Sequence, residues 1–267
     1  MNERCLLMPV ITLTSDWGLH DHYLAAVKGK ILATQPGIQI IDLNHSIEPF
    51  NLAQAAFILR NAYRQFPAGT VHMVCVNAEI TAEQECIAMH SEGHFFVAAD
   101  NGLPGLLFDD EQKVEYARVN AGNDWQHAFP ELEVFVPAAC TLAETGQIEK
   151  VGGKTAKVNL QVPFRPAIDE AVITGSVIYI DSYQNAITNI SRSLFDRIGK
   201  GRKFEIFIKS NHYRLSRLND TYRETPVGEL LALFNSAGLL EIAINNGNAA
   251  SLLGLENGSV IRIKFHE

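Results

Sequence analysis

The chain has 267 residues, of which 47% are hydrophobic and 19% charged, a composition ordinary for a globular protein with one or two domains. Its formal net charge of -8 argues against nucleic acid as the main partner, because phosphate binding requires a basic face. The start of the chain lacks a signal-peptide pattern, and no apolar run approaches the ~20 residues that span a bilayer, so we expect neither export nor membrane insertion.

The first part of the chain alternates strand-like and helix-like segments. Expected strands lie at 10–14, 38–43, 70–76, 85–90 and 94–99, and expected helices at 23–34, 51–66 and 134–144. The second helix has the clearest pattern, since Leu52, Ala55 and Leu59 recur at the spacing of one buried face. Alternating elements with short loops predict a layered α/β domain with helices covering a sheet, which we assign to residues 1–162.

The composition changes after this domain. Segment 162–166 contains two prolines and reads as an extended connector, because each proline disfavours helix for the residue before it. Beyond it, segments 171–180, 203–209 and 259–265 alternate apolar and polar residues as half-buried strands do. We therefore predict a smaller all-β barrel domain over residues 168–267, with one short helical turn near 247–254.

Cysteine usage indicates the redox environment. The four cysteines, Cys5, Cys75, Cys86 and Cys140, have no CxxC spacing and lie mostly in apolar runs. Buried reduced thiols are expected in preference to zinc ligands or a disulfide framework. This usage predicts a cytoplasmic protein.

Two polar stretches, 14–21 and 181–189, each follow a run that reads as a buried strand. Asp16 stands where the first strand ends, which is the edge at which open α/β sheets bind ligands. A carboxylate there suits a ribose diol, because its two oxygens can accept from both hydroxyls. Asp181 and the amides that follow it can pair with an amine and with a purine edge, so the two stretches together predict a nucleoside site.

With these residues in place, the chain resembles the family of S-adenosyl-L-methionine hydrolases, which form adenosine and are related to the fluorinases and chlorinases. The resemblance covers nearly the whole length, and the order and spacing of its blocks make it specific. The blocks are 14–21, 28–29, 41–47, 66–72, 100–103, 179–190 and 235–243.

The resemblance implies an α/β N-terminal domain, a β-barrel C-terminal domain and a homotrimer, with sites between the N-domain of one subunit and the C-domain of the next. It implies an adenosyl ligand, no metal and no cofactor. In the family's reaction, water or halide attacks the ribose 5′ carbon while methionine leaves as a neutral thioether. Such a reaction depends mainly on desolvating and aligning the nucleophile.

The resemblance also implies roles for individual residues. Asp16 would bind the ribose hydroxyls and Phe50 would form an aromatic wall beside the sulfonium. Asp181 would hold the methionine amino group, Ser236 its carboxylate, and Asn185 the adenine edge. Further substrate contacts implied by position are Trp17, Asp21, Asn101, Phe129, Tyr183, Tyr222 and Ala249.

The sequence departs from the family where the hydrolases orient their water with an aspartate, an arginine and a histidine. Asn77 stands at the aspartate, Gln84 or Glu85 at the arginine, and Pro130 at the histidine. Asn77 is therefore the one candidate catalytic residue by position. The other polar groups nearest in sequence to the altered positions are Glu79, His127 and Glu131.

Three functions remain open. The first is a hydrolase that releases adenosine, with its water held by substitute residues. The second is a catalytically silent protein that binds S-adenosylmethionine or adenosine. The third is an unrelated nucleoside-binding enzyme that uses the same scaffold on another substrate.

Simpler interpretations apply to several of these residues. Asp16 could cap the helix that follows it, because a carboxylate can accept from backbone N–H groups of a first turn. Phe50 could be a core aromatic, and Asn101 and Asn185 could be turn residues. His20 lies near Asp21 and His22, yet no further ligand cluster stands at a suitable spacing, so we predict no metal site there.

Overall fold

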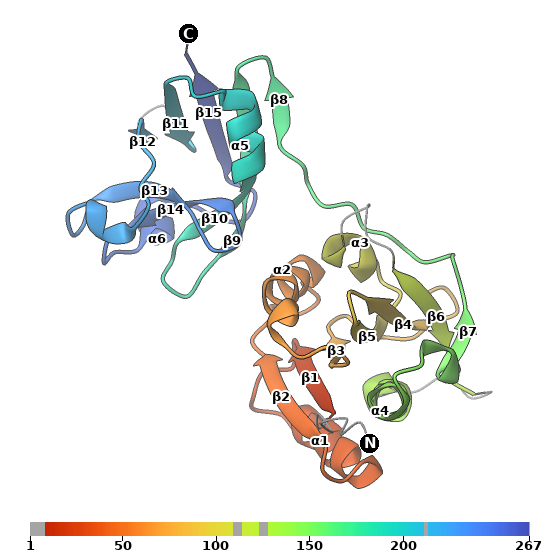
Figure 1. The fold of residues 1–267 in the computed structure, drawn as a ribbon. Coiled ribbons are helices and arrows are strands. Elements are labelled where there is room, and N and C mark those ends of the chain that lie inside the picture. The colour runs from red at the N-terminus through yellow and green to blue at the C-terminus, as the bar shows by residue number, and fades with distance from the viewer. Residues whose placement is uncertain (1–8, 109–113, 123–127, 211–212, 267) are drawn as a thin grey trace, which may run out of the picture. The chain divides into compact units, whose positions relative to one another are not determined.

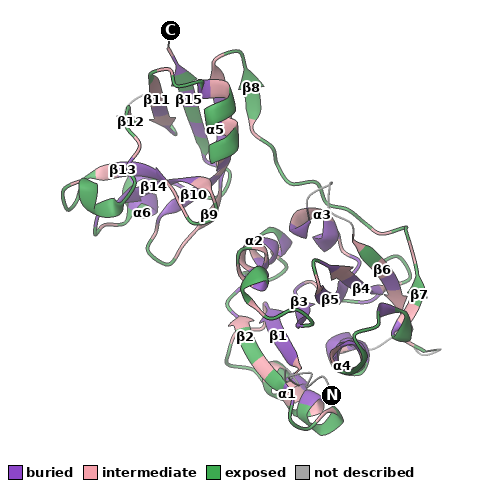
Figure 2. Ribbon diagram, viewed as in Figure 1, coloured by how far each residue is buried: buried purple, intermediate pink, exposed green. Residues whose placement is uncertain are grey.

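The computed structural model describes residues 9–108, 114–122, 128–210 and 213–266. The chain forms two compact units, Met1–Pro163 and Phe164–Glu267 (Figure 1). Each unit has its own buried hydrophobic core, which Figure 2 shows as purple segments inside both. The two-domain α/β plus β-barrel architecture expected from the sequence is confirmed.

The first unit is built on a mixed seven-stranded sheet. In spatial order its strands are β2 (Gln39–Asn44), β1 (Val10–Ser15), β3 (Val71–Cys75), β5 (His94–Ala99), β4 (Cys86–Ser91), β6 (Glu115–Val119) and β7 (Gly152–Lys154). The first four run parallel, and the last three pair antiparallel. The chain leaves β1 toward β2 on one side and returns to β3 on the other, so the strand order reverses between β1 and β3.

Helices cover both faces of this sheet. On one face lie α1 (Tyr23–Thr34) and α4 (Val136–Thr145), and on the other lie α2 (Leu52–Ala62) and α3 (Leu103–Leu107), as Figure 1 shows. A hydrophobic core lies on each face of the sheet. Alternate residues of the central strands contribute to one core or the other, because successive side chains of a strand point to opposite faces. Phe95 and Val97 join the α1 side, whereas Phe96 and Ala98 join the α2 side.

Local sequence accounts for the start of α2. The Asn51 side chain caps this helix by accepting the backbone N–H of Gln54 at 3.0 Å. Its buried residues include Leu52, Ala55 and Leu59, which is the periodic face that the sequence predicts. The cap fixes the segment before the helix, where Phe50 lies.

The end of the first unit is fastened to the loop after β5. The Asn159 backbone N–H donates to Asp100 Oδ1 at 2.7 Å, and its side-chain amide donates to the Asp100 carbonyl at 2.8 Å. The Gln161 N–H then donates to the Gly102 carbonyl at 3.1 Å. A side chain at Gly105 would collide with the Gln161 carbonyl oxygen, so the close approach of this segment requires glycine there.

The second unit is an antiparallel, barrel-like sheet. Its strands are β8 (Ala167–Asp169), β9 (Val172–Ile180), β10 (Ala186–Ser191), β11 (Phe204–Ile208), β12 (Tyr213–Leu215), β13 (Leu230–Phe234), β14 (Leu239–Ile244) and β15 (Val260–Phe265). The first half of β9 pairs with β15 and its second half with β10, which joins the two parts of the sheet. Helices α5 (Arg192–Gly199) and α6 (Ala249–Leu253) pack against this core.

Several boundaries differ from expectation for identifiable reasons. The helix expected at 51–66 ends at Ala62 and continues as a 3-10 turn, Tyr63–Gln65, because Phe66 precedes a proline and is extended. The helix expected at 134–144 is preceded by a π-helical turn, Glu131–Phe135. Pro137 lies in the first turn of α4, where its missing N–H removes no helical hydrogen bond.

Other expectations have simple outcomes. Cys75, Cys86 and Cys140 are buried free thiols, as expected, and Cys5 lies outside the described residues. Within the described ranges, no helix has the length and apolar character needed to cross a membrane. Two further short 3-10 turns, Ile148–Lys150 and Tyr222–Glu224, were not expected from the sequence.

We predict that Phe96→Ala destabilises the first unit by about 3–5 kcal/mol, because Phe96 is fully buried and packs edge-on against Tyr63 and Phe108. Urea unfolding of the full chain measures the loss. Phe164→Ala is the matched control, since that ring is 88% exposed and its removal should change stability by less than about 0.5 kcal/mol. Equal effects of the two substitutions would contradict the assigned core.

Candidate functional site

Three predicted site residues lie at the carboxyl ends of adjacent parallel strands. Asp16 follows β1, Asn77 comes two residues after β3, and Asn101 comes two residues after β5. The strand order reverses between β1 and β3, and open α/β sheets bind ligands at such a reversal. The fold therefore places this group where a small ligand is expected.

The Asp16 carboxylate is oriented by backbone groups from two distant segments. Its Oδ2 accepts the N–H of Phe50 at 2.9 Å and that of Asn77 at 3.5 Å. Both donors have left-handed backbones, with φ of 67° and 48°, a conformation that non-glycine residues adopt only at a cost. Within the described residues Oδ1 accepts no hydrogen bond, so it can accept from a ligand hydroxyl.

This arrangement decides between two interpretations of Asp16. A capping residue would bond to the first turn of α1, yet the residue at that N-cap is His22. Asp16 instead accepts from Phe50 and Asn77, so the capping interpretation is wrong. Phe50 itself is 72% exposed, which also excludes the core-aromatic interpretation for this unit.

Buried Ser15 and His45 and the exposed Asp42 form a Ser–His–Asp array at the end of β1. Ser15 Oγ lies 2.7 Å from His45 Nδ1, and His45 Nε2 lies 3.2 Å from Asp42 Oδ1 without the alignment of a hydrogen bond. Lys28 Nζ donates to the other Asp42 oxygen at 2.7 Å. Ser15 is only 1% exposed, so it cannot act as a nucleophile on a substrate. We assign the array a structural role in fixing the loop after β1, since the His45 carbonyl also accepts the Gly18 N–H at 2.8 Å.

Aromatic side chains gather after β1. Trp17 lies edge-on to Phe129, with ring centroids 5.7 Å apart, and Tyr23 lies 6.3 Å from Trp17 and 5.3 Å from Phe129. The structure thus brings the predicted residues Trp17 and Phe129 together and adds Tyr23. Asp21 is exposed and outside this cluster, and the described residues contain no group of three acidic, histidine or cysteine side chains suited to a metal.

The loop after β3 carries the altered family positions and is held by local hydrogen bonds. Asn101 Nδ2 donates to the Asn77 carbonyl at 2.9 Å, and Gln84 Nε2 donates to the carbonyls of Asn77 at 3.2 Å and Glu79 at 2.6 Å. Glu85 is paired with Arg118. Both residues at the arginine position are therefore engaged in structural contacts, and Glu79 is exposed.

A buried carboxyl group lies in the helical turn that precedes α4. Glu131 begins the π-helical turn before α4 and is 7% exposed. Burial raises the pKa of Glu131 to about 7; its own backbone N–H opposes the rise, and the charge of Asp16 adds to it. Burial is the main cause of the raised pKa values of Cys75 and Cys86, and the charge of Glu131 adds to both.

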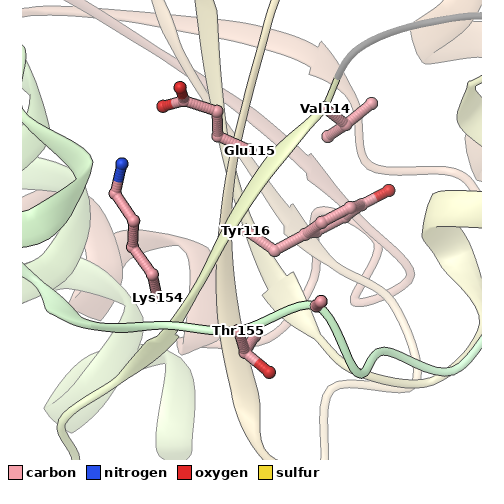
Figure 3. Close-up of a pocket in the computed structure, with 6 residues that line it drawn as sticks. Val114, Glu115, Tyr116, Lys154 and Thr155 are labelled. Carbon is pink, nitrogen blue, oxygen red and sulfur yellow. The ribbon is translucent and has the colours of Figure 1, made fainter.

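Two cavities of about 290 Å³ each lie at the surface of the first unit. One is lined by the start of β6 with the residue before it and by the end of β7 with the two residues after it. Figure 3 shows Glu115 and Lys154 on one side of the β6 ribbon and Tyr116 on the other. This cavity contains none of the predicted site residues. The second lies between segments 80–86 and 119–122 and has Cys86 in its lining.

In the second unit, Asp181 organises the turn from β9 to β10. Its Oδ1 accepts the backbone N–H groups of Tyr183 at 2.9 Å and Asn185 at 2.8 Å, and its Oδ2 accepts the Asn185 side-chain amide at 3.1 Å. The Asn185 amide oxygen accepts no hydrogen bond within the described residues. The Gln184 carbonyl accepts the Ala250 N–H at 2.8 Å, which fixes Ala249 and the start of α6 beside this turn.

A second buried carboxylate links Tyr222 to the turn that carries Ser236. Glu241 on β14 is 2% exposed; its two oxygens accept the Tyr222 hydroxyl at 2.6 Å and the Asn235 amide at 3.1 Å. Asn235 Oδ1 in turn accepts the backbone N–H groups of Ala237 and Leu239 at 3.0 and 3.2 Å. Ser236 is exposed at the tip of this turn.

In the first unit, hydrogen bonds link Asp16 to Phe50 and Asn77, and Asn77 to Asn101, whereas Asp21 lies apart. In the second unit, they link Asp181 to Tyr183 and Asn185. Sequence reasoning assigned no role to Ser15, His45, Tyr23 or Glu241, although all but Tyr23 lie within blocks that carry the resemblance. A polar residue inside an otherwise apolar strand, as at Glu241, is the signal that could have marked it. His127, which was considered for water orientation, lies outside the described residues.

Comparisons with known proteins find relatives that span both units. Residues 11–152 match the family model described as the SAM hydroxide adenosyltransferase N-terminal domain, and residues 175–262 match the C-terminal domain. Relatives named (R)-S-adenosyl-L-methionine hydrolase include those of Thermus thermophilus, 30% identical, and Salinispora tropica, 28% identical. Alignments to the two cover 96% of this chain and 100% and 97% of the relatives.

More distant relatives and solved structures extend the likeness. A protein of Actinopolyspora mzabensis named fluorinase is 25% identical over 96% of this chain and 97% of its own length. The crystal structure of an uncharacterized conserved protein from Thermotoga maritima superposes with a TM-score of 0.85 at 28% identity, covering 96% of this chain and 99% of that one.

Glu131→Gln should stabilise the protein in a pH-dependent manner. The folded pKa of about 7 lies above the ordinary 4.5, so ionisation of Glu131 opposes folding increasingly as the pH rises between these values. The gain in the free energy of unfolding should be absent below about pH 4.5 and reach at most ~3 kcal/mol above pH 7. Unfolding measured at pH 5 and pH 8 tests this, with exposed Glu133→Gln as control. An equal gain at both values would contradict it.

Tyr222→Phe should destabilise the second unit by about 1–3 kcal/mol, because it leaves one oxygen of the buried Glu241 carboxylate without its donor. Thermal unfolding of the full chain provides the measurement. Tyr183→Phe serves as control, since that side chain is 78% exposed and should change stability by less than about 0.5 kcal/mol. A neutral Tyr222→Phe would show that the hydroxyl is dispensable.

Proposed function

This chain belongs to the SAM hydroxide adenosyltransferase family, and we propose that it hydrolyses S-adenosyl-L-methionine to adenosine and methionine. The observation that carries the proposal is the full-length match to proteins named (R)-S-adenosyl-L-methionine hydrolase, combined with the oriented Asp16 carboxylate at the strand-order reversal. The reaction is proposed to need no cofactor and no metal. The free buried thiols support a cytoplasmic location.

In the first unit, Asp16 is proposed to bind the ribose. Backbone donors already occupy Oδ2, so Oδ1 is the oxygen that would accept from the diol. Exposed Phe50 and the Trp17–Phe129 pair supply aromatic surface for the sulfonium and the ribose. An aromatic face stabilises a cation by roughly 0.5–2 kcal/mol, which favours binding of the charged substrate more than its conversion.

In the second unit, the proposed contacts are to the methionine and the base. Asp181 would receive the ammonium group, and the Ser236 hydroxyl would donate to the carboxylate. The Asn185 amide oxygen suits the exocyclic amine of adenine, because its NH₂ is already committed to Asp181. Tyr222 and Tyr183 offer rings for the base, and Ala249 a backbone contact. We further propose that the protein functions as a homotrimer.

The chemistry requires little covalent help from the protein. Methionine leaves as a neutral thioether, so the enzyme must mainly desolvate the water and align it opposite the sulfur. Asn77 and Asn101 would support the position of Asp16 and of the loop beside it, since the Asn77 N–H contacts Asp16 and Asn101 holds the Asn77 carbonyl.

A silent binding protein is the second candidate. It is favoured by the replacement of the water-orienting residues, because Gln84 and Glu85 are occupied in structural contacts and Pro130 has no polar side chain. Incubation of the protein with S-adenosylmethionine, followed by chromatography of adenosine, separates the two. The hydrolase forms adenosine and methionine in equal amounts, whereas the binder gives calorimetric binding without product. If neither S-adenosylmethionine nor adenosine binds to the protein, both functions are contradicted.

Asp16→Asn should lower kcat/KM by about 10- to 100-fold, because a hydrogen bond to a charged group contributes roughly 1.5–3 kcal/mol. The variant keeps one oxygen for the backbone N–H groups but places an NH₂ where the ribose hydroxyls would donate. Asp196→Asn, at an exposed position in α5, is the matched control and should leave kcat/KM unchanged. A wild-type value for Asp16→Asn would remove Asp16 from the site.

A further inference from the structure

The short segment that carries Asp16 is attached on both of its flanks to a single residue, His45, which directly follows β2. On the first flank, Ser15 Oγ lies 2.7 Å from His45 Nδ1. On the second flank, the backbone N–H of Gly18 donates to the His45 carbonyl at 2.8 Å. Asp16 and the aromatic Trp17 are therefore the two residues between the contacts of one histidine.

These contacts begin where the backbone pairing of β1 with β2 ends. The last pair of the parallel ladder is Thr14 with Asn44, and the register shifts between Leu13 and Thr14. A register shift of this kind redirects the side chains that follow it. The next residues along the two strands are Ser15 and His45, so their side-chain hydrogen bond continues the attachment where the ladder stops.

The imidazole of His45 is buried and lies between Ser15 and a charged pair. It is 6% exposed, and its Nε2 lies 3.2 Å from Asp42 Oδ1. Lys28 on α1 donates to the other Asp42 oxygen at 2.7 Å. A carboxylate beside Nε2 favours the proton on that nitrogen, which leaves Nδ1 to accept the Ser15 hydroxyl. The ring thus connects α1 and β2 to the end of β1.

The segment that begins with His45 also supplies a donor to the Asp16 carboxylate. Phe50 lies five residues after His45, and its N–H donates to Asp16 Oδ2 at 2.9 Å. Between the two, Ile47 is 3% exposed and packs in the core beneath α2. Segment 45–50 therefore fixes the backbone on both sides of Asp16 and one of its carboxylate oxygens.

Burial excludes a direct chemical role for the Ser15 and His45 side chains. Ser15 is 1% exposed, and the Nδ1 atom of His45 is engaged with it. Neither side chain is placed to touch a ligand. Any effect of the pair on a ligand must pass through Asp16, which directly follows Ser15 in the chain.

We propose that His45 and Ser15 are positioning residues of the ribose site, which direct the Asp16 carboxylate toward a 2′,3′-diol. The inference rests on the proposed function, in which Asp16 binds the ribose hydroxyls. A hydrogen bond weakens steeply when donor and acceptor are misaligned. Loss of the bond between Ser15 and His45 should therefore weaken recognition of the diol more than binding of the rest of the ligand.

The selectivity for a diol tests this role. Calorimetry with wild-type protein should show adenosine binding at least about 10-fold more tightly than 2′-deoxyadenosine, which lacks one hydroxyl. Ser15→Ala removes the bond to His45 and should weaken adenosine binding by about 3- to 10-fold. Binding of 2′-deoxyadenosine should weaken by a smaller factor, so the ratio of the two dissociation constants falls. A smaller folded fraction would weaken both equally and leave that ratio unchanged.

The chain offers a matched control on the same strand. Thr12 of β1 makes an equivalent contact, with its Oγ1 2.8 Å from Nδ1 of the buried His72, but away from the strand end. Thr12→Val should lower stability and leave the selectivity at its wild-type value.

Two variants of His45 separate its ring nitrogens. His45→Asn places an amide oxygen near the position of Nδ1 and should retain most of the selectivity. His45→Gln places its amide group near the position of Nε2 and should lose it. If His45→Gln fails to fold, Ser15→Ala decides alone.

Each outcome bears on the proposal. Wild-type selectivity in Ser15→Ala and His45→Gln would overturn the positioning role and leave the proposed function standing. The role would also be overturned by an equal loss for both nucleosides, by the same change in Thr12→Val, or by His45→Asn no better than His45→Gln. Equal binding of the two nucleosides by wild type would overturn it as well. Wild-type protein that binds neither adenosine nor S-adenosylmethionine would overturn the role and the proposed function together.

Discussion

The arrangement of the loops at the ligand edge of the first unit depends on a single carboxylate oxygen. Asp16 Oδ2 gathers the backbone N–H groups of Phe50 and Asn77, so the end of β1, the segment before α2 and the loop after β3 meet at one atom. Both donors hold left-handed backbones, which cost of order 1–3 kcal/mol each unless the surroundings enforce them. The Asp16 carboxylate helps to hold both backbones, and its second oxygen accepts no hydrogen bond from the described residues.

The two units use buried acids in opposite ways. Glu241 has both oxygens satisfied, by Tyr222 and Asn235, and thereby fixes the turn that carries Ser236. Among the residues that the structure describes, Glu131 receives a hydrogen bond only from its own backbone N–H, and burial raises its pKa to about 7. A satisfied acid rigidifies a structure, whereas burial of an acid with few partners is costly.

Much of the architecture could be predicted because its signals are local. The face of α2 and the alternation in β15 follow directly from periodicity, and a strand end before Asp16 predicts the ligand edge. α3 could not be predicted, since its five residues include a proline and a glycine. The hydrogen bonds of Asp16 could not be predicted either, because the Phe50 N–H lies 34 positions away and depends on backbone angles that sequence does not reveal. Roles drawn from position, such as that of Ser236, depend on the resemblance alone.

The fastening of segment 159–161 to the loop after β5 restricts where the chain can change in length. Asn159 bonds to Asp100, and Asp100 directly precedes Asn101, which holds the loop beside Asp16. An insertion or deletion upstream of Gln161 would therefore pull on a residue of the ligand edge. We therefore expect this chain to tolerate changes in linker length only from residue 162 onward.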